Sequence, residues 1–428
     1  MRDIALLVMM LGAIGVTIRV PWIGVLVLSV LSYLNPHRYA WGFMFSFPVY
    51  QLLFLVAVVA LIKQWQDRQP FPRDWRIVAF FMLWSYFLVT TIDSAVPWAA
   101  WPRLIEVSKV YLPFVLTLWL IDTRQKLFFL IITIASSIAL VAVKGGIFAI
   151  ATAFSYRVWG PPGSMFYGNN EFAIATLMVT PLLVLWFRET KDRRIRYLLM
   201  AVIPLCIASA LSSYSRGALL TIAVLGSMLL WHSKRKWLAI PIFVVGGIVA
   251  AQNLPDAWFD RMNTIETYEV DKSAQGRLEA WRDGITYALS NPLTGAGFDG
   301  WRHVTRRDWH SAYVEALAEH GFVGFGLWAS LLLGSMLSLT RLPRLTRHIP
   351  EMKWVANYSY MLRASLAAYA TGSLFLGITY WDLLYHIVFI AVLVRKFALE
   401  ELAEHVAKPA QSHSSPAPLP ISAPALRH

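Results

Sequence analysis

Residues 127–153, LFFLIITIASSIALVAVKGGIFAIATA, form an apolar run long enough to cross a lipid bilayer as a single helix. Similar runs recur along the chain, which is 57% hydrophobic and only 15% charged. A water-soluble domain of this size cannot bury so much apolar surface. The composition therefore predicts an all-α fold, that of a polytopic integral membrane protein.

The apolar runs predict about twelve transmembrane helices. The first run, 4–34, is broken near Arg19 and Pro21, and the sequence leaves open whether it forms one span or two. The remaining runs are 43–62, 77–92, 104–121, 127–153, 171–187, 197–212, 217–232, 237–252, 321–340, 355–376 and 381–397.

These runs divide the chain into four parts. We expect an N-terminal transmembrane bundle (1–252, about ten crossings), a long loop with its own helices (253–320), C-terminal transmembrane helices (321–397) and a tail (398–428). From about residue 408 the tail is rich in Pro, Ser and Ala, which predicts disorder. The N-terminus lacks a small-residue cleavage site, so we expect the first span to be retained.

Lysine and arginine give the orientation. The connectors that fall on one side are basic: 63–76, 122–126, 188–196, 233–236, 341–353 and 395–396. By the positive-inside rule this side is cytoplasmic, which makes loop 253–320 extracytoplasmic and both termini cytoplasmic. The net charge of +13 then reflects topology, with anionic membrane lipids and not nucleic acid as the partner.

The long loop is expected to contain two helices. Residues 277–289 form an amphipathic pattern that ends before Asn291 and Pro292, and residues 309–320 form a second, with Asp308 as its cap and Gly321 as its stop. Four tryptophans of the loop suit a segment lying at the membrane interface: Trp258, Trp281, Trp301 and Trp309.

Three outer-side residues are predicted to lie at helix starts. Arg216 follows Ser215, which can cap the next helix, Arg277 opens the loop helix, and His310 lies in the first turn of the second one. A helix start offers free N–H groups and partial positive charge, so it attracts anions, and an arginine fork strengthens the attraction. The same positive end favours a neutral imidazole, which can act as a general base.

Structural alternatives exist for each of these residues. An outer-face arginine can be an interfacial anchor, and a loop histidine can be a solvated or capping residue. Arg157 precedes the turn GPPGSMFYGNNEFA (160–173), and Asn170 lies within it at a helix entrance; they are candidate substrate ligands or parts of a connector and a helix cap. The lone Cys206 allows no internal disulfide.

No metal cage or nucleotide-binding loop is evident in the sequence, so we expect neither a metal nor another cofactor. The apolar spans also lack an obvious series of buried Asp, Glu and His, which a proton-coupled transporter would need. A lipid-linked glycan transporter is the competing class, and charges gathered on one outer face favour an enzyme over it. A membrane scaffold would not explain the loop.

Three motifs in order carry a family resemblance: SSYSRGALL (212–220), GRLEAWRDGITYALSNPLTGAGFDGW (276–301) and HSAYVEALAEHGFVG (310–324). Together they resemble the O-antigen ligase and polymerase superfamily, over roughly 160–340. The stretch SYLNPHRYAWGF (32–43) is similar to the branch of O-glycosylation ligases. The family's frequent His-Asn pair is replaced here by His310-Ser311.

The resemblance implies a metal-independent, inverting glycosyltransferase of the bacterial inner membrane, with its active site facing the periplasm. Its donor would be a glycan on undecaprenyl diphosphate, and its acceptor the lipid A–core oligosaccharide, in lipopolysaccharide biosynthesis. A glycoprotein acceptor and an O-antigen polymerase are the alternatives. By motif, Arg216, Arg277 and His310 match the family's catalytic residues, with Arg216 and Arg277 also binding substrate beside Arg157, Asn170 and Tyr313.

Overall fold

The computed structural model describes residues 2–67, 70–233, 236–263 and 272–407. Over these ranges the regular structure is helical, which confirms the predicted all-α class. The tail from residue 408, for which the sequence predicts disorder, lies outside the described residues, as does part of the long loop.

Sixteen α-helices and four short 3₁₀ helices make up the described chain. In order they are α1 (Arg2–Arg19), α2 (Pro21–Tyr33), η1 (Pro36–Tyr39), η2 (Phe43–Phe45), α3 (Val49–Lys63), η3 (Trp65–Asp67), α4 (Trp75–Ile92), α5 (Pro97–Leu120), α6 (Arg124–Ala151), α7 (Asn169–Glu189), α8 (Arg193–Leu211), α9 (Arg216–Trp231), α10 (Lys236–Asn253), α11 (Asp256–Asn263), α12 (Lys272–Ser290), α13 (Trp301–Val304), α14 (Ala312–Thr346), η4 (Pro350–Met352), α15 (Lys353–Gly372) and α16 (Asp382–Ala407).

Five described helices are long and apolar enough to cross a membrane: α4, α6, α7, α8 and α14. Three shorter apolar helices, α2, α3 and α9, accompany them. A polytopic membrane protein is thereby confirmed, while about twelve crossings remains a prediction. The first apolar run forms two helices, α1 and α2, because the backbone leaves helical geometry at Val20 and Pro21 starts a new helix.

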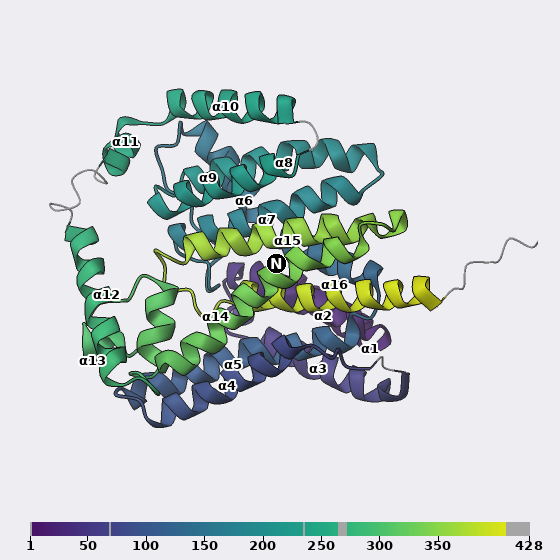
Figure 1. Cartoon of the computed structure of the whole chain (residues 1–428), viewed down its shortest axis with the longest axis horizontal. Coiled ribbons are helices and arrows are strands. Elements are labelled where there is room, and N and C mark those ends of the chain that lie inside the picture. Colours follow the sequence, from purple (N-terminus) through teal and green to yellow (C-terminus); the bar gives the residue numbers. More distant parts are fainter. Residues whose placement is uncertain (1, 68–69, 234–235, 264–271, 408–428) are drawn as a thin grey trace, which may run out of the picture.

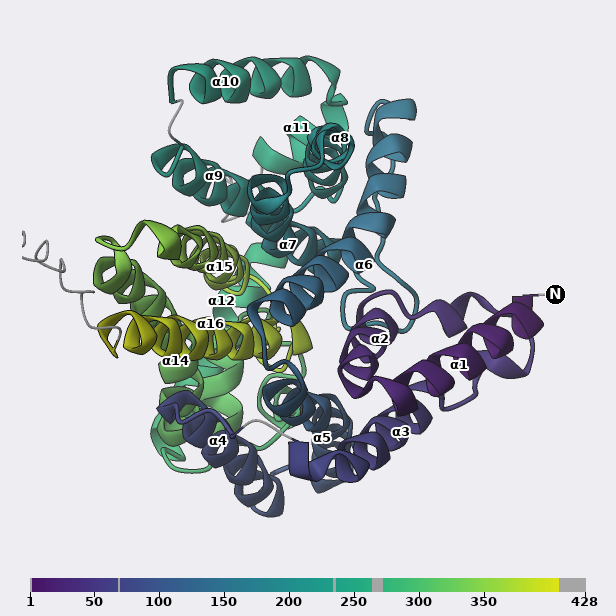
Figure 2. The same ribbon diagram turned by 90° about the vertical axis from the view of Figure 1, so that its right-hand side faces the viewer.

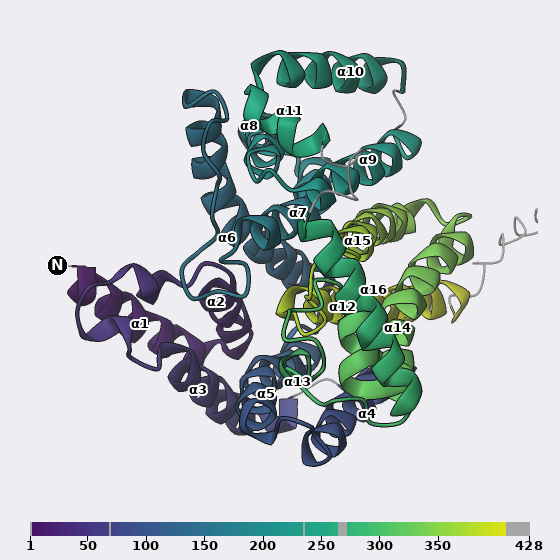
Figure 3. The ribbon, with the colours of Figure 1, turned by 90° about the vertical axis from the view of Figure 1, so that its left-hand side faces the viewer.

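The helices pack around a fully enclosed centre. Every side chain of α16 from Leu383 to Val394 is buried, so this helix is surrounded on all sides. Helices α7, α15 and α16 run through the middle, and α14 crosses obliquely in the view of Figure 1, in contact with α15 and α16. Viewed from the ends, α1 and α3 extend to one flank, and α8, α9 and α10 form another (Figures 2 and 3).

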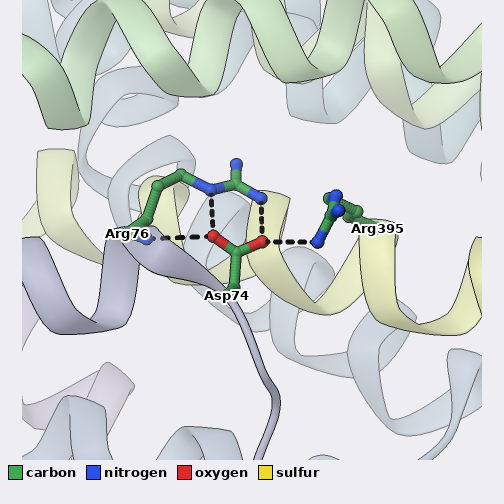
Figure 4. Close-up of polar contacts among 3 residues, drawn as sticks. All are labelled: Asp74, Arg76 and Arg395. Carbon is green, nitrogen blue, oxygen red and sulfur yellow. Dashed lines mark hydrogen bonds and ion pairs between the residues drawn. The ribbon is translucent and has the colours of Figure 1, made fainter.

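One end of the bundle joins the connectors predicted to be cytoplasmic. Asp74 is the N-cap of α4 and accepts bonds from the Arg76 backbone N (3.0 Å), Nε (2.8 Å) and Nη2 (2.7 Å), and from Arg395 Nη1 (3.2 Å) (Figure 4). Burial alone would raise the pKa of Asp74, but the hydrogen bonds and charge of Arg76, with the charge of Arg395, lower it below its usual value. This end is closed by paired charges.

The opposite end joins connectors predicted to be extracytoplasmic. The backbone N of Ala95 donates to Ala296 O (3.1 Å), and Ser212 Oγ donates to Tyr156 O (2.6 Å). In each of these contacts a connector of one predicted set meets a partner of the same set. Helices α11, α12 and α13 lie across this second end and cover it in the view of Figure 3.

Candidate functional site

The turn before α9 is held by its own side chains and by two neighbouring segments. Ser215 caps α9 by accepting a bond from the Ala218 N (3.3 Å), so the helix begins at Arg216, as predicted. Asn169 Nδ2, in the first turn of α7, donates to Ser213 O (2.7 Å). The backbone of Tyr214 takes the left-handed conformation, with φ of 56°.

This turn gathers three of the predicted residues. The Arg157 guanidinium lies 5.7 Å from the centre of the Tyr214 ring, and Asn170 follows Asn169 in α7. Arg157, Asn170 and Arg216 therefore share one corner of the outer end, which we call the first corner. Arg216 is half-buried there and has polar or electrostatic partners of its own.

The glycine-rich stretch after α12 ties this end together. Ala296 N donates to Ala318 O and Gly297 N donates to Glu319 O, both at 2.8 Å. Gly297 has φ of 76°, and any side chain there would collide with Ser94. Only glycine therefore fits where the stretch passes between the α4–α5 connector and α14.

Helix α12 begins earlier than the sequence predicts. It starts at Lys272 and ends at Ser290, directly before Asn291, so its end is confirmed. Arg277 consequently lies in the second turn, and the argument that it sits at a helix start is wrong. Its surroundings are nevertheless basic and polar, since neighbouring Gly276 faces the Arg307 guanidinium, which pairs with Glu279 at 3.6 Å.

Two of the four loop tryptophans expected at the membrane interface are packed inside the protein, while Trp281 and Trp301 are half-buried. Trp309 has no exposed surface and Trp258 is only 7% exposed. Trp309 packs against Gly284 of α12, where an added side chain would come within 2.7 Å of its ring, and its carbonyl accepts a bond from Trp281 Nε1 (2.8 Å). Together with Val314, these rings form a small apolar core that fixes α12 to α14.

His310 lies outside the helix in which the sequence places it. The N-cap of α14 is Ser311, and α14 begins at Ala312. His310 is exposed, has φ of 47°, and donates its backbone N–H to Asp308 Oδ1 (3.1 Å). Asp308 thus fixes the His310 turn and does not cap the helix. The predicted stop is confirmed, because Gly321 interrupts α14 with φ of 61°.

The connector 373–381, between α15 and α16, carries no motif and was missed by the sequence reasoning. Ala312 N donates to Ser373 O, and Thr379 Oγ1 donates to Ala312 O, both at 2.9 Å. Phe375 packs against Gly217 beside Arg216. The connector therefore joins the first corner to the segment that holds His310.

The remaining predicted residue, Tyr313, lies in the first turn of α14, three residues after His310. Arg277 lies one turn of α12 before Trp281, whose indole bonds the Trp309 carbonyl. We call the region of Arg277, His310 and Tyr313 the second corner.

The Tyr313 hydroxyl donates to Ala370 O (3.0 Å) on α15, so its described contact is structural. Glu315, two residues further along α14, accepts a bond from the Thr379 backbone N (2.9 Å). The only sequence signal for Glu315 is its place in the His310 motif.

A buried chain of hydrogen bonds lies beneath His310. Trp309 Nε1 donates to Glu319 Oε1 (3.0 Å), and the Tyr380 hydroxyl donates to Glu319 Oε2 (2.5 Å). Burial, with the charge of Glu319, raises the pKa of Tyr380 well above its usual value, so the phenol keeps its proton. His320 bonds both Tyr380 Oη (2.7 Å) and Thr90 Oγ1 (2.8 Å). The chain fixes the residue next to His310.

These buried groups overturn one argument from the sequence. Glu315, Glu319 and His320 on α14, with Asp382 and His386 on α16, are all buried, so the helices do carry a series of buried titratable side chains. The series falls near the outer helix ends and was hidden because its partners are distant in the chain. The sequence-based argument against a transporter, that such a series is missing, therefore no longer holds.

Taken together, the fold and this end of the bundle define a polytopic helical membrane protein with a basic, hydrogen-bonded centre at one membrane face. Residues 199–329 match the family described as O-Antigen ligase, and residues 1–210 match a Family of unknown function (DUF5935). The chain thus carries an O-antigen ligase domain. No curated protein matches it in sequence.

The matched segment contains the turn before α9, all of α12 and the start of α14. It therefore includes Arg216, Arg277 and His310. Members of this family are enzymes of the O-antigen ligase and polymerase type, which implies glycan transfer and lipid-linked glycan substrates.

Proposed function

We propose that the protein is an O-antigen ligase that transfers a glycan from undecaprenyl diphosphate to the lipid A–core oligosaccharide. The reaction would take place on the periplasmic face of the bacterial inner membrane. The observation that carries the proposal is the family match over 199–329, which includes Arg216 of the first corner and the whole of the second.

In the proposed step, a hydroxyl of the acceptor attacks the anomeric carbon opposite the diphosphate. The new carbon–oxygen bond forms as the bond to the diphosphate breaks, so the configuration inverts and the diphosphate leaves with the electron pair. His310 takes the hydroxyl proton and later returns it to water. Arg216 and Arg277 stabilise the charge that develops on the diphosphate, which makes a divalent metal ion unnecessary.

The geometry of His310 supports this role over that of its neighbours. His310 is exposed, and its backbone sits in a left-handed conformation fixed by Asp308. Such strained conformations concentrate at functional sites. His320 is 1% exposed and engaged at both ring nitrogens, which leaves it no access to a substrate.

The test is transfer in a defined system. The purified protein in lipid nanodiscs receives undecaprenyl diphosphate-linked glycan with lipid A–core in one reaction and a candidate glycoprotein in another, each with and without EDTA. We expect glycosylated lipid A–core and no effect of EDTA. Transfer only to protein would reassign the acceptor, elongation of the donor would indicate a polymerase, and donor movement across vesicles without transfer would refute the proposal.

A further inference from the structure

A cavity of about 490 Å³ opens beside the second corner. Its walls come from the start of α5, the turn around Asp299, the start of α13 and Asp308. Asp308 is also the residue that fixes the His310 backbone. The cavity therefore adjoins the proposed general base without containing any of the residues assigned above to catalysis.

Two indole rings give the cavity apolar faces. Trp98 is 70% exposed, and Trp301 is half-buried on the opposite element. The guanidinium of Arg302 lies 5.7 Å from the centre of the Trp98 ring and 4.4 Å from that of the Trp301 ring, so it interacts with both indoles. Exposed indoles at a polar site supply flat, rigid contact surfaces for a ligand with apolar patches.

The charged groups of the cavity are already paired with one another. Arg103 Nη1 bonds Glu106 Oε2 at 2.7 Å, and Arg302 Nε lies 3.7 Å from Asp299 Oδ2. With Asp308, the cavity holds three carboxylates against two guanidiniums. This balance opposes a diphosphate or an anionic lipid headgroup. Among the described residues, no group of three or more acidic, His or Cys side chains is placed to hold a metal ion.

A neutral, hydroxyl-rich ligand with apolar faces fits these walls. Pyranose rings stack their C–H faces on indoles, and their vicinal hydroxyls bond to carboxylates and guanidiniums that are held in place by each other. We propose that this cavity, which we call the Trp98 cleft, binds a sugar ring of one of the two glycans. The inference rests on the proposed function and deepens it.

The experiment separates the two possible sources of the sugar. Kinetics with Trp98→Ala and Asp299→Asn are measured against lipid A–core at saturating donor, and against undecaprenyl diphosphate-linked glycan at saturating acceptor. Asparagine tolerates the left-handed backbone of residue 299, which has φ of 56°, so the second variant changes charge and not conformation. We expect KM to rise about five- to tenfold for one substrate and to stay unchanged for the other.

A matched control is Trp231→Ala. Trp231 is 76% exposed and is the last residue of α9, whereas Arg216 is the first. Its loss should therefore change neither KM. A direct arm uses His310→Ala protein, in which binding of lipid A–core and of donor is measured with and without the Trp98→Ala change. If the wild-type protein shows no transfer, the proposed function is refuted, and the proposal for the cleft is still decided by the binding measurements. Unchanged binding of both glycans by the Trp98 variant would refute the proposal that the Trp98 cleft binds a sugar ring.

Discussion

The two ends of the helix bundle use charge in opposite ways. At the end that holds Asp74, Arg76 has no exposed surface and its guanidinium makes two bonds to one carboxylate. At the other end, His310 and Arg157 are exposed, and the backbone turns through left-handed positions at Tyr214 and His310. The first end is arranged to hold helices together, and the second accepts local strain to present side chains.

This difference separates residues that stabilise the protein from residues that serve its chemistry. Buried pairs are costly to break because the remaining charge is left without a partner. Exposed groups near strained turns contribute little to stability, and they are free to contact a substrate. Substitutions at the two ends should therefore fail in different assays.

The sidedness of the two ends is tested by labelling. With Cys206, which is buried, replaced by serine, single cysteines are placed at Arg282 on α12 and at Arg193 on α8, both exposed. In intact spheroplasts an impermeant maleimide should label the Arg282 position completely and the Arg193 position only after lysis. The reverse labelling pattern would show that the topology is inverted and that the site does not face the periplasm.

The next effect in size concerns the proposed base. His310→Ala should lower transfer by about 10²–10⁴-fold, because the acceptor hydroxyl would lose its proton acceptor. Donor binding should persist, since the arginines remain. His303→Ala is the matched control, as His303 is exposed in the same segment. Wild-type transfer by His310→Ala, or activity lost to EDTA and restored by magnesium, would contradict the mechanism.

The arginines should show a somewhat smaller loss. Arg277→Ala and Arg216→Ala are each expected to reduce transfer about 10²–10³-fold, the cost of removing one preorganised group that stabilises developing charge. Lysine should restore little activity if the contact is a two-pronged fork. Arg282→Ala on the same helix provides the control, because its only described ion pair is the exposed one with Asp283. Equal losses at Arg277 and Arg282 would point to a general surface effect.

The opposite end should respond in stability and not in chemistry. Asp74→Asn leaves Arg76 buried without its charge partner, so we expect a loss of about 3–5 kcal/mol in unfolding free energy with little change in turnover per folded molecule. Asp122→Asn is the control, since its pair with Lys126 (2.7 Å) is partly exposed and worth under about 1 kcal/mol. Equal losses of unfolding free energy in the two variants would show that the buried Asp74 pair contributes no more to stability than a partly exposed one.

The sign of the pH dependence follows from the lowered pKa of Asp74. Its stabilising contribution is fully present above the pKa of an unfolded aspartate, about 3.9, and is lost as the pH falls through the lower folded value. Between pH 5 and 8 the cluster should therefore contribute a constant amount.

Local signals allowed much of this molecule to be predicted from its sequence. The apolar runs, the Ser215 cap, the end of α12 before Asn291 and the stop at Gly321 depend only on neighbours in the chain, and the structure agrees with them. The positions of His310 and Trp309 depend on distant partners. Ala312 is held by Ser373, and Trp309 by Glu319 and α12.

Long-range pairing also explains what the sequence could not reveal. Glu319 and His320 lie on an apparently ordinary amphipathic stretch, and only the fold brings Tyr380 and Thr90 to them. The Trp98 cleft likewise combines residues some 200 positions apart. In both cases the chemistry-bearing residues carry no local pattern, so no reading of spacing could assemble them.

The break at Gly321 has a mechanical consequence for α14. The turns from Ala312 to His320 are bonded to Ser373, Thr379 and Tyr380, whereas the part beyond Gly321 continues as an apolar helix to Thr346. A span adjusts its tilt to the thickness of the surrounding lipid. Gly321 is itself packed against the carbonyl oxygens of Pro292 and Leu293, so the kink is held in place and a tilt of the span is passed on to the segment beside His310. Transfer rates should accordingly change when they are measured across bilayers of graded acyl-chain length, and Gly321→Ala should lose both stability and transfer, because its methyl group would meet those carbonyl oxygens at a positive φ.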